Sequence, residues 1–507
     1  GVITLVTRTA DKPLEAKAGI RAGGYGTEDY YAVINGRQDR WSYFLDAGFL
    51  NFKGYQHGAY EDDVNLYSRI AYQPDDASTI MFHGSRYSSD ANYANSLSLA
   101  QFEEDPRQNP GDDQSLDDNY YLGALVYDRS LGDADLSLKM EYKDEKTQMF
   151  WSGLWFEFDE WEAHPELTLS WHHNIGTMRN MISIGGEYRY HEIDTLLNMA
   201  PDNVIGTRIG DRNREDPSWA AYLQDELRIT DALTLTAGLR YDYYQQEQVG
   251  NVNASNTWEQ SNSALSPKIG ASYSFSNAVN LFAGFNTGFK SPARVPAAAT
   301  SGELDPEYIY AYEVGVRGNP LPWLDYNLAF FWHDVNDKFV KKSPDVGAPY
   351  ENAGKTRSKG IEMGANASFE NGLYAKLSYT YQEAKYVDYT VSGVSYDDNY
   401  IPNIPKNMFG GALGYRHAWL GDISLHPVYE GKKYLNNANT LEWDGFWLLN
   451  AKYRKRFTDW NPEVEFFVTA SNLTDEAEVT TGSGDPGDES LYPIAGRTIF
   501  AGLDISF

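Results

Sequence analysis

Apolar and polar residues alternate along most of the chain with a period of two. In residues 136–143, 233–244, 373–381 and 496–507, every second residue is apolar, and the residues between are mostly polar, charged or glycine. Successive side chains of a strand point to opposite faces, so each stretch predicts a strand with one apolar and one polar face. The apolar faces often carry Tyr or Trp at their ends, and the polar faces carry full charges. This combination favours a wall between lipid and a polar lumen over a soluble sandwich.

The last of these stretches, residues 496–507, ends at the final residue, Phe507. A strand in that position must pair with another strand, because an unpaired strand leaves a bare sheet edge. Pairing of the last strand with the first is the simplest solution, and it closes the sheet into a barrel. The pattern therefore predicts a closed β-barrel.

The predicted connections between strands alternate between short turns and long loops. The ten short turns are residues 38–40, 74–77, 131–134, 175–178, 230–232, 276–278, 318–323, 370–372, 419–422 and 458–462. The longest loops, rich in Gly, Asp and Asn, are residues 89–118, 194–215, 288–306, 386–402 and 475–495. Short turns on one rim and long loops on the other are typical of transmembrane barrels.

The turns also give the size of the barrel. Ten turns join ten pairs of strands, and a first and a last strand bring the number to about 22, a size at which barrels enclose a plugged lumen. The predicted fold is therefore all-β, a transmembrane antiparallel β-barrel over residues 11–507 with long extracellular loops. No helical stretch with capping signals is predicted. Residues 1–8 differ from the rest, because Val2, Ile3, Leu5 and Val6 place apolar groups on both faces, as in a strand buried on both sides.

Composition agrees with a barrel and excludes other classes. The chain of 507 residues has 38 Tyr and 13 Trp, yet no run approaches the 18 apolar residues of a transmembrane helix. There is no Cys, which excludes disulfides, thiolate metal sites and cysteine nucleophiles. The net charge of -30 argues against nucleic acid as a partner. The acidic surface is interpreted as solvated. A more specific alternative is that acidic loops contact divalent cations at a lipopolysaccharide surface.

No catalytic arrangement stands out, so the chain is not expected to be an enzyme. His172 and His173 are adjacent in a predicted strand and therefore cannot share one metal ion. The glycines of a GxGxxG string, Gly482, Gly484 and Gly487, lie in a predicted loop with no helix after it, and we interpret them as turn glycines. Acidic loop clusters leave loop-bound Ca²⁺ open, against plain solvated loops. These clusters are Glu61–Asp63, Asp112–Asp113, Asp117–Asp118, Asp397–Asp398 and Asp485/Asp488/Glu489.

Several stretches resemble the TonB-dependent outer-membrane receptors of the ferric siderophore type. They are residues 222–244 with LQDEL and LTAGLRYDYY, 285–318 with GFKSPA and LDPEYIYAYEVGVRG, 352–362 with NAGKTRSKGIE, and 468–507 with VTASNLTD and AGRTIFAGLDISF. Residues 1–10 resemble the last strand of that family's N-terminal plug domain, which is otherwise absent. An unplugged barrel would be a wide pore, so we interpret the plug as removed, processed or separate.

The resemblance implies a location, a function and a set of partners. The location is the outer membrane of a Gram-negative bacterium, with outer-membrane lipid and lipopolysaccharide around a monomeric barrel. The function is active uptake of a scarce iron chelate, a ferric siderophore, energised by TonB through the missing N-terminal region. The alternatives are another scarce ligand (cobalamin, another metal complex or an oligosaccharide), a passive porin-like channel, and a structural or adhesive surface barrel.

Basic residues are scarce, and several lie in predicted long loops. If the ligand is an anionic chelate, Arg side chains can grip it with paired, charge-assisted hydrogen bonds, and aromatic rings can pack on its organic part. The predicted ligand-binding residues are Tyr87, Arg107, Trp151, Trp155, Arg208, Arg212, Arg214, Lys290 and Arg294. The alternative is that these cations pair with the abundant Asp and Glu, and that the Trp residues contact lipid.

Two further expectations concern the ligand and the wall. Residues 97–110, LSLAQFEEDPRQNP, resemble a loop of ferric-citrate-type receptors, which favours a carboxylate chelate. Lumen residues are expected to form wall networks and plug contacts; they are Arg240, Glu313, Arg317 and Glu362. Asp225 does not fit the alternation, because it shares the apolar face of its predicted strand with Leu223 and Leu227.

Overall fold

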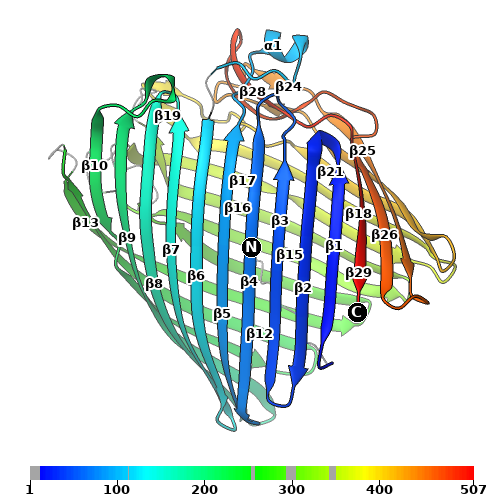
Figure 1. The fold of residues 1–507 in the computed structure, drawn as a ribbon. Helices are drawn as coiled ribbons and strands as arrows, with labels where there is room; N and C mark the ends of the chain where they lie inside the picture. Colours follow the sequence, from blue (N-terminus) through cyan, green and yellow to red (C-terminus); the bar gives the residue numbers. More distant parts are fainter. Residues whose placement is uncertain (1–11, 112–113, 253–256, 293–303, 342–349) are drawn as a thin grey trace.

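The last strand of the chain pairs with the first described strand and closes the sheet. The computed structural model describes residues 12–111, 114–252, 257–292, 304–341 and 350–507. In it, β1 (Glu15–Gly23) pairs antiparallel with both β2 (Thr27–Gln38) and β29 (Thr498–Ser506), and the seam is visible at the right of Figure 1. The predicted C-terminal strand and the predicted closure are therefore confirmed.

The remaining strands of the barrel follow in chain order, each antiparallel to its neighbours. They are β3 (Trp41–Phe52), β4 (Tyr60–Asp75), β5 (Ser78–Tyr93), β6 (Gln114–Ser130), β7 (Ala134–Trp151), β8 (Leu154–Ile175), β9 (Met178–Met199), β10 (Arg208–Glu215), β11 (Ser218–Arg228), β12 (Leu233–Gly250), β13 (Trp258–Ser276), β14 (Val279–Lys290), β15 (Glu307–Leu321), β16 (Leu324–Lys341), β17 (Tyr350–Ser368), β18 (Leu373–Asp388), β21 (Asn407–His417), β22 (Gly421–Glu430), β25 (Phe446–Phe457) and β26 (Glu463–Ser471).

Two of these segments share one place in the wall. Both β10 and β11 lie between β9 and β12, so the 23 strands of the sheet fill 22 positions. The interruption falls at Pro217, which has no N–H to donate to a ladder. The predicted strand number of about 22 is confirmed.

The barrel is apolar outside and polar inside. On β12, Leu239 and Tyr241 point outward with exposed fractions of 48% and 38%, whereas the alternate residues Asp242 and Gln246 are buried on the inner side. This is the reverse of a soluble protein, in which the large apolar side chains are the buried ones. Within the described ranges, no helix has the length and apolar character needed to span a bilayer.

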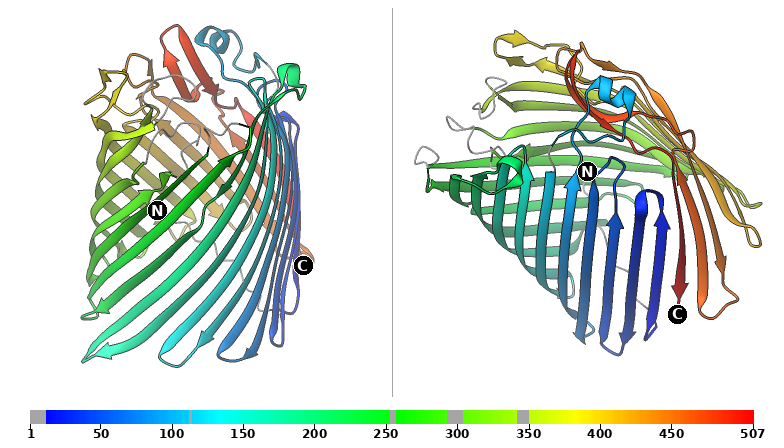
Figure 2. Two further views of the ribbon diagram at one scale, coloured as in Figure 1. Left: turned by 90° about the vertical axis from the view of Figure 1, so that its left-hand side faces the viewer. Right: turned by 45° about the horizontal axis from the view of Figure 1, so that its top comes forward.

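The two rims differ in their connections. Each of the ten predicted short turns joins two consecutive strands at the rim opposite the long loops, so that prediction is confirmed. This rim runs along the bottom and the right-hand side of the barrel in Figure 1 and in the right panel of Figure 2. The long loops were predicted too long: residues 194–199 and 208–215 continue as β9 and β10, and residues 89–93 and 114–118 continue as β5 and β6. These extensions carry polar residues on both faces. The alternation of apolar and polar residues therefore ends before the ladder of backbone hydrogen bonds does.

The long-loop rim carries small elements of its own. They are the helix α1 (Leu99–Glu104), the 3-10 turns at Gly24–Gly26 and Pro201–Asn203, and the hairpins of β19 (Thr390–Val391) with β20 (Val394–Ser395), β23 (Lys433–Tyr434) with β24 (Glu442–Trp443), and β27 (Val479–Asp485) with β28 (Asp488–Pro493). The expectation of no capped helix was wrong. Ser98 Oγ accepts from the Gln101 backbone N–H, and Gln101 Oε1 accepts from that of Ser98, a capping box that the S-x-x-Q spacing could have revealed.

Three of the long loops pack together into what we call the loop cluster, whose buried residues are Leu97, Phe102, Leu435, Val479 and Leu491. Lys433 is buried beside it, and its ammonium donates to Glu430 and to the carbonyls of Val479 and Thr480. Gly484 and Gly487 have positive φ in the β27–β28 hairpin, so they are turn glycines as interpreted from the sequence.

The closing seam depends on a glycine. A Cβ at Gly502 would lie 2.6 Å from the Ile20 carbonyl oxygen across the seam and would also meet the Phe467 ring, so Gly502→Ala should lower the free energy of unfolding by about 1–3 kcal/mol. Gly123→Ala, on β6, meets nothing within 4 Å and serves as the control. The measurement is thermal unfolding of the detergent-solubilised barrel followed by circular dichroism; equal midpoints for both variants would contradict this account of the seam.

Candidate functional site

Two arginines of the predicted set lie side by side on the inner face of β10. On β9, Ile184 and Tyr188 point outward with exposed fractions of 55% and 45%, so the alternate residues of β9 face the lumen. Arg212 lies opposite Thr195 and Arg214 opposite Ile193, both on that inner face. The broken strand position formed by β10 and β11 therefore presents two half-buried guanidinium groups to the lumen, near the long-loop rim.

The two arginines differ in their partners. Arg214 Nε lies 3.0 Å from Asp216 Oδ2. Asp216 is also held by His191, whose Nδ1 is 3.7 Å away, and by the Gln246 amide, which donates to Asp216 Oδ1 at 3.1 Å. Among the residues that the structure describes, the guanidinium group of Arg212 forms no ion pair and no hydrogen bond. Arg214 is thus part of the wall, and Arg212 is a cation whose hydrogen-bonding capacity is unused.

The wall around this pair is otherwise charge-balanced. His191 Nε2 lies 2.8 Å from Glu160 Oε2, and Lys143 Nζ lies 3.7 Å from Glu160 Oε1. Lys143 also contacts Glu145. Carboxylates and cations therefore alternate across the inner faces of β7, β8 and β9, and the chain of pairs ends at Arg214.

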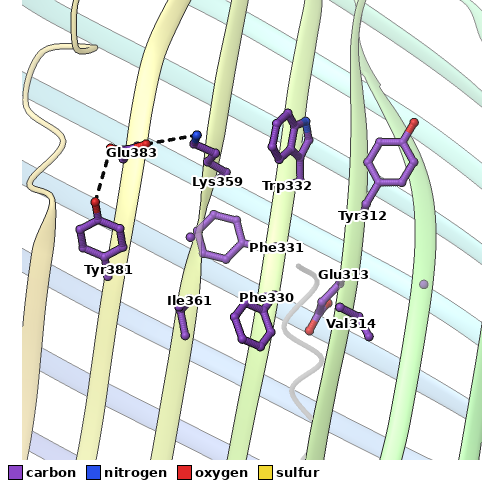
Figure 3. Close-up of a pocket in the computed structure, with 12 residues that line it drawn as sticks. Tyr312, Glu313, Val314, Phe330, Phe331, Trp332, Lys359, Ile361, Tyr381 and Glu383 are labelled. Carbon is purple, nitrogen blue, oxygen red and sulfur yellow. Dashed lines mark hydrogen bonds and ion pairs between the residues drawn. The ribbon is translucent and has the colours of Figure 1, made fainter.

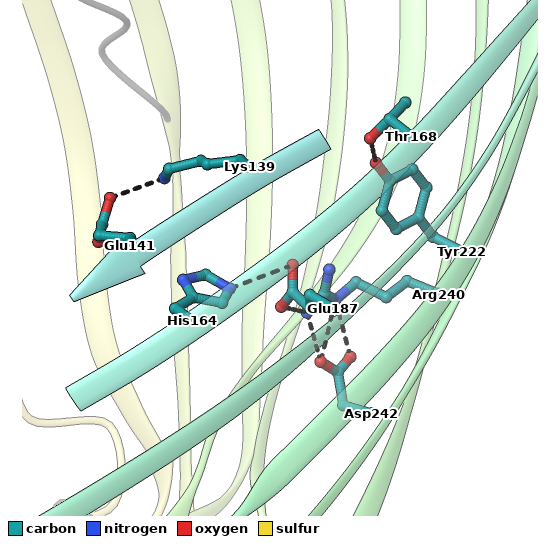
Figure 4. A network of polar contacts seen from close by, with 8 residues as sticks. All are labelled: Lys139, Glu141, His164, Thr168, Glu187, Tyr222, Arg240 and Asp242. Atoms are coloured by element: carbon teal, nitrogen blue, oxygen red, sulfur yellow. Dashed lines mark hydrogen bonds and ion pairs between the residues drawn. The ribbon is translucent and has the colours of Figure 1, made fainter. Parts of the chain in front are cut away.

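A second network lies further along the same inner wall (Figure 4). Arg240 donates to both Glu187 and Asp242, and His164 Nε2 lies 3.9 Å from Glu187 Oε2. The Thr168 and Tyr222 hydroxyls are hydrogen-bonded at 2.6 Å. Arg240 is thus a member of a wall network.

The other predicted lumen residues lie on the opposite side of the barrel. Glu313 and Glu362 project from the inner faces of β15 and β17, because their neighbours Val314 and Met363 point outward. Arg317 packs over the Phe282 ring at 5.7 Å.

Three more predicted ligand residues face the lumen or its rim but stand apart from Arg212. Tyr87 is on the inner face of β5. Its neighbour Arg86 lies opposite Leu66, which points outward, and adjacent residues of a strand point to opposite faces. Lys290 Nζ lies 3.9 Å from Glu307 Oε2 and 5.1 Å from the Phe339 ring centroid. Trp151 lies at the tip of the β7–β8 hairpin with an exposed fraction of 52%.

The remaining predicted ligand residues do not join them. A bulge between Arg208 and Gly210 turns Arg208 to the outer face, where its Nη1 lies 3.2 Å from Asp211 Oδ2. Trp155 is on the outer face of β8, because it lies opposite Asn198, which shares the outward face of β9 with Tyr188. Arg294 lies outside the described residues.

Arg107 holds a loop in place. Its guanidinium carbon lies 5.4 Å from the Tyr25 ring centroid and 5.9 Å from that of Tyr55, and its Nε donates to the Tyr55 carbonyl at 3.1 Å. Burial raises the pKa of Tyr25 and of Tyr55 above the ordinary value for a phenol, so both rings stay neutral faces for the cation.

Asp225, the exception in the sequence pattern, does lie on the outer face of β11. Its Oδ1 accepts a hydrogen bond from the Asn180 amide on β9, and Asn180 is buried. The carboxylate therefore has a polar partner on a face that is otherwise apolar.

The acidic runs do not converge into a metal site in the described part of the chain. Glu61–Asp63 and Asp117–Asp118 lie in β4 and β6, where neighbouring side chains alternate between faces. Over the described ranges, no group of three or more His, Cys, Asp or Glu residues could hold a metal ion. His172 and His173 contact Asp135 and Trp171 respectively, from opposite faces of β8.

Comparison with known proteins gives a consistent result. Residues 19–473 match the family model described as TonB dependent receptor-like, beta-barrel. The ferrioxamine receptor of Yersinia enterocolitica is 26% identical over 51% of this chain and 35% of its own length, and the metal-pseudopaline receptor CntO of Pseudomonas aeruginosa is 26% identical over 55% and 43%. The chain thus spans less than half the length of these relatives.

Solved structures share the fold. The unliganded ferric citrate transporter FecA superposes with a TM-score of 0.89 at 18% identity, covering 99% of this chain and 80% of that one. The siderophore receptor PiuA from Acinetobacter baumannii superposes with a TM-score of 0.85 at 16% identity, covering 99% and 82%.

The wall network around Arg240 can be tested by removing its cation. Arg240→Gln leaves Glu187 and the buried Asp242 without their shared partner, and should lower the free energy of unfolding by about 1–3 kcal/mol. Arg317→Gln is the matched control, because Arg317 packs on a ring and has no ion pair within the described ranges. Denaturant unfolding of the two variants in detergent should separate them; the network assignment fails if they lose the same stability.

Proposed function

Because the chain belongs to the TonB-dependent receptor-like β-barrel family, we propose that it forms the wall of an outer-membrane receptor that takes up a scarce, anionic iron chelate. The family consists of receptors and transporters, not enzymes, and its location is the Gram-negative outer membrane. The names of the relatives support an iron or metal chelate as cargo, since they include a ferrioxamine and a metal-pseudopaline receptor.

The observation that carries the proposal is the state of Arg212. The chain has 72 Asp and Glu against 42 Lys and Arg, so a carboxylate partner is easy to supply. A half-buried guanidinium loses hydration, and an ion pair or hydrogen bond normally compensates that loss. Arg212 has no such compensation in the described chain, and it stands beside a second guanidinium, that of Arg214. This arrangement favours an anionic group arriving from the lumen.

The chemistry of the pair fits a chelate with carboxylate or catecholate oxygens. A guanidinium offers donors in a planar fork that matches two oxygens of one anionic group. Arg212 would supply the free fork, while Asp216, His191 and Gln246 keep Arg214 in position. Tyr87, Trp151, Lys290 and Arg294 are proposed as further contacts along the path from the long-loop rim.

The resemblance of residues 97–110 to a loop of ferric-citrate-type receptors does not carry the preference for a citrate-like cargo. In the stretch 97–110, Leu97 and Phe102 are buried in the loop cluster, and Arg107 clamps Tyr25 and Tyr55. Loop packing therefore accounts for much of that sequence without any ligand. The carboxylate class is proposed from Arg212, not from this stretch.

Energised uptake also needs a domain that closes the lumen and a partner that supplies energy. We assign residues 1–10, which lie outside the described residues, to the last strand of a plug domain, and TonB to the role of energising partner. A monomeric barrel surrounded by outer-membrane lipid completes the proposal.

The proposal predicts a difference between the two faces of β10. Arg212→Gln should weaken binding of ferric citrate, used as a carboxylate probe, by about tenfold, because one charge-assisted hydrogen-bonding fork is lost. Arg208→Gln, on the outer face of the same strand, should leave the affinity unchanged. The measurement is quenching of intrinsic Trp fluorescence by the probe, with ferrioxamine B as a chelate that lacks free carboxylates.

Saturable binding that Arg212→Gln weakens and Arg208→Gln does not would support the assignment. Unsaturable binding would favour a passive channel instead. Equal binding by the wild type and both variants would remove Arg212 from the site.

A further inference from the structure

A groove of about 660 Å³ lies on the outer wall across β14–β18 (Figure 3). Its apolar lining includes Val314, Phe330, Trp332, Ile361 and Tyr381. The larger of these side chains point outward, away from the lumen, so the groove faces the surrounding membrane. A groove of this size and lining fits an acyl chain.

Cations lie at the end of the groove nearer the long-loop rim. We call Arg357, Lys359, Lys385 and Lys406 the cationic strip. Arg357 and Lys359 both lie against the Trp332 ring, at 4.6 and 5.7 Å from its centroid. Lys385 and Lys406 both lie against the Tyr400 ring, at 4.7 and 3.8 Å. Lys385 is opposite both Arg357 on β17 and Tyr400, so these residues share one face.

Only half of the strip is neutralised. Arg357 donates to both oxygens of Asp334, and Lys359 Nζ lies 3.3 Å from Glu383 Oε2. Lys385 and Lys406 have no ion pair within the described ranges. The strip therefore has a surplus of positive charge in a chain whose net charge is -30.

The opposite outer wall shows the reverse charge. On β6–β9, the outward positions near the long-loop rim carry carboxylates, which are Asp117, Asp144, Glu157, Asp159, Glu192 and Asp194. Lys146 among them is already paired with Glu157, at 3.2 Å. The outer face at the groove is therefore positively charged where the opposite wall is negatively charged, and this asymmetry is complementary to an anionic head group held at the groove.

From the groove, the cationic strip and this asymmetry, we infer that the outer wall of β14–β18 binds one phosphorylated lipid of the outer leaflet. An acyl chain lies in the groove against Phe330 and Ile361, and the phosphate lies between Lys385 and Lys406. The aromatic rings of Trp332 and Tyr400 hold the cations at the depth where head groups meet hydrocarbon. This site is on the outer surface and is independent of cargo binding at Arg212.

The test compares the two cations of the strip that lack carboxylate partners with a single outward cation elsewhere that also lacks one among the described residues. The double variant Lys385→Gln/Lys406→Gln removes the unpaired charges of the strip without leaving a carboxylate unpaired. Arg86→Gln is the control, since Arg86 also points outward against a ring, that of Tyr121 at 5.5 Å, with no ion pair among the described residues. Each protein, solubilised in a neutral detergent, is titrated with dioleoyl phosphatidic acid and with dioleoyl phosphatidylcholine, and bound lipid is counted by native mass spectrometry.

We expect the wild type to retain one phosphatidic acid with a preference of about tenfold over phosphatidylcholine. The double variant should lose that preference, and Arg86→Gln should keep it. Binding that inorganic phosphate abolishes at millimolar concentration would mean an adventitious anion site and would overturn the inference. So would equal retention of the two lipids by the wild type, or an equal loss in both variants. Ile361→Trp, which fills the groove, should weaken phosphatidic acid binding while leaving the cations in place.

Discussion

Everything in this molecule depends on the hydrogen-bonded seam between β1 and β29. In lipid, no water is present to satisfy a free strand edge, so each backbone N–H and C=O must find a partner within the sheet. The register of the seam sets Ile20 opposite Leu503 and Arg21 opposite Gly502. Because closure fixes which residues face outward on the first and last strands, it fixes the inner and outer faces of every strand between them.

Closure also separates the side chains into two environments, which are the hydrated lumen on the inside and lipid on the outside. The inner wall is a continuous series of ion pairs, from Lys143 through Glu160 and His191 to Asp216 and Arg214. These side chains are only 14–29% exposed, so each partner compensates part of the lost hydration of the group beside it and holds that group in position. Arg212 differs because it is placed among these pairs and completes none of them.

The fold was largely predictable from the sequence, and the site only in part. Period-two alternation identifies strands that contact water on one face and lipid on the other, and turn residues mark where such strands end. For this reason β12 and all ten short turns could be predicted. The alternation disappears where strands rise above the apolar band, so β10 was taken for a loop. Even a correct strand assignment would have placed Arg208 on the same face as Arg212, because the bulge at Ile209 leaves no signal in the residue pattern. Trp155 faces outward by strict parity, which could have been counted from Trp161.

The loop cluster has a consequence for how such a surface can diversify. Leu97 belongs to the β5–β6 loop, Leu435 to the β22–β25 loop and Leu491 to the β26–β29 loop, and the three are packed in one small core. Asn403, from a fourth loop, exchanges hydrogen bonds with the backbone of Gly482. These loops are therefore not independent modules: recombination that exchanges one of them alone would leave its former neighbours without a fitting surface. Lineages of this protein should inherit the loops of this half of the rim as a set.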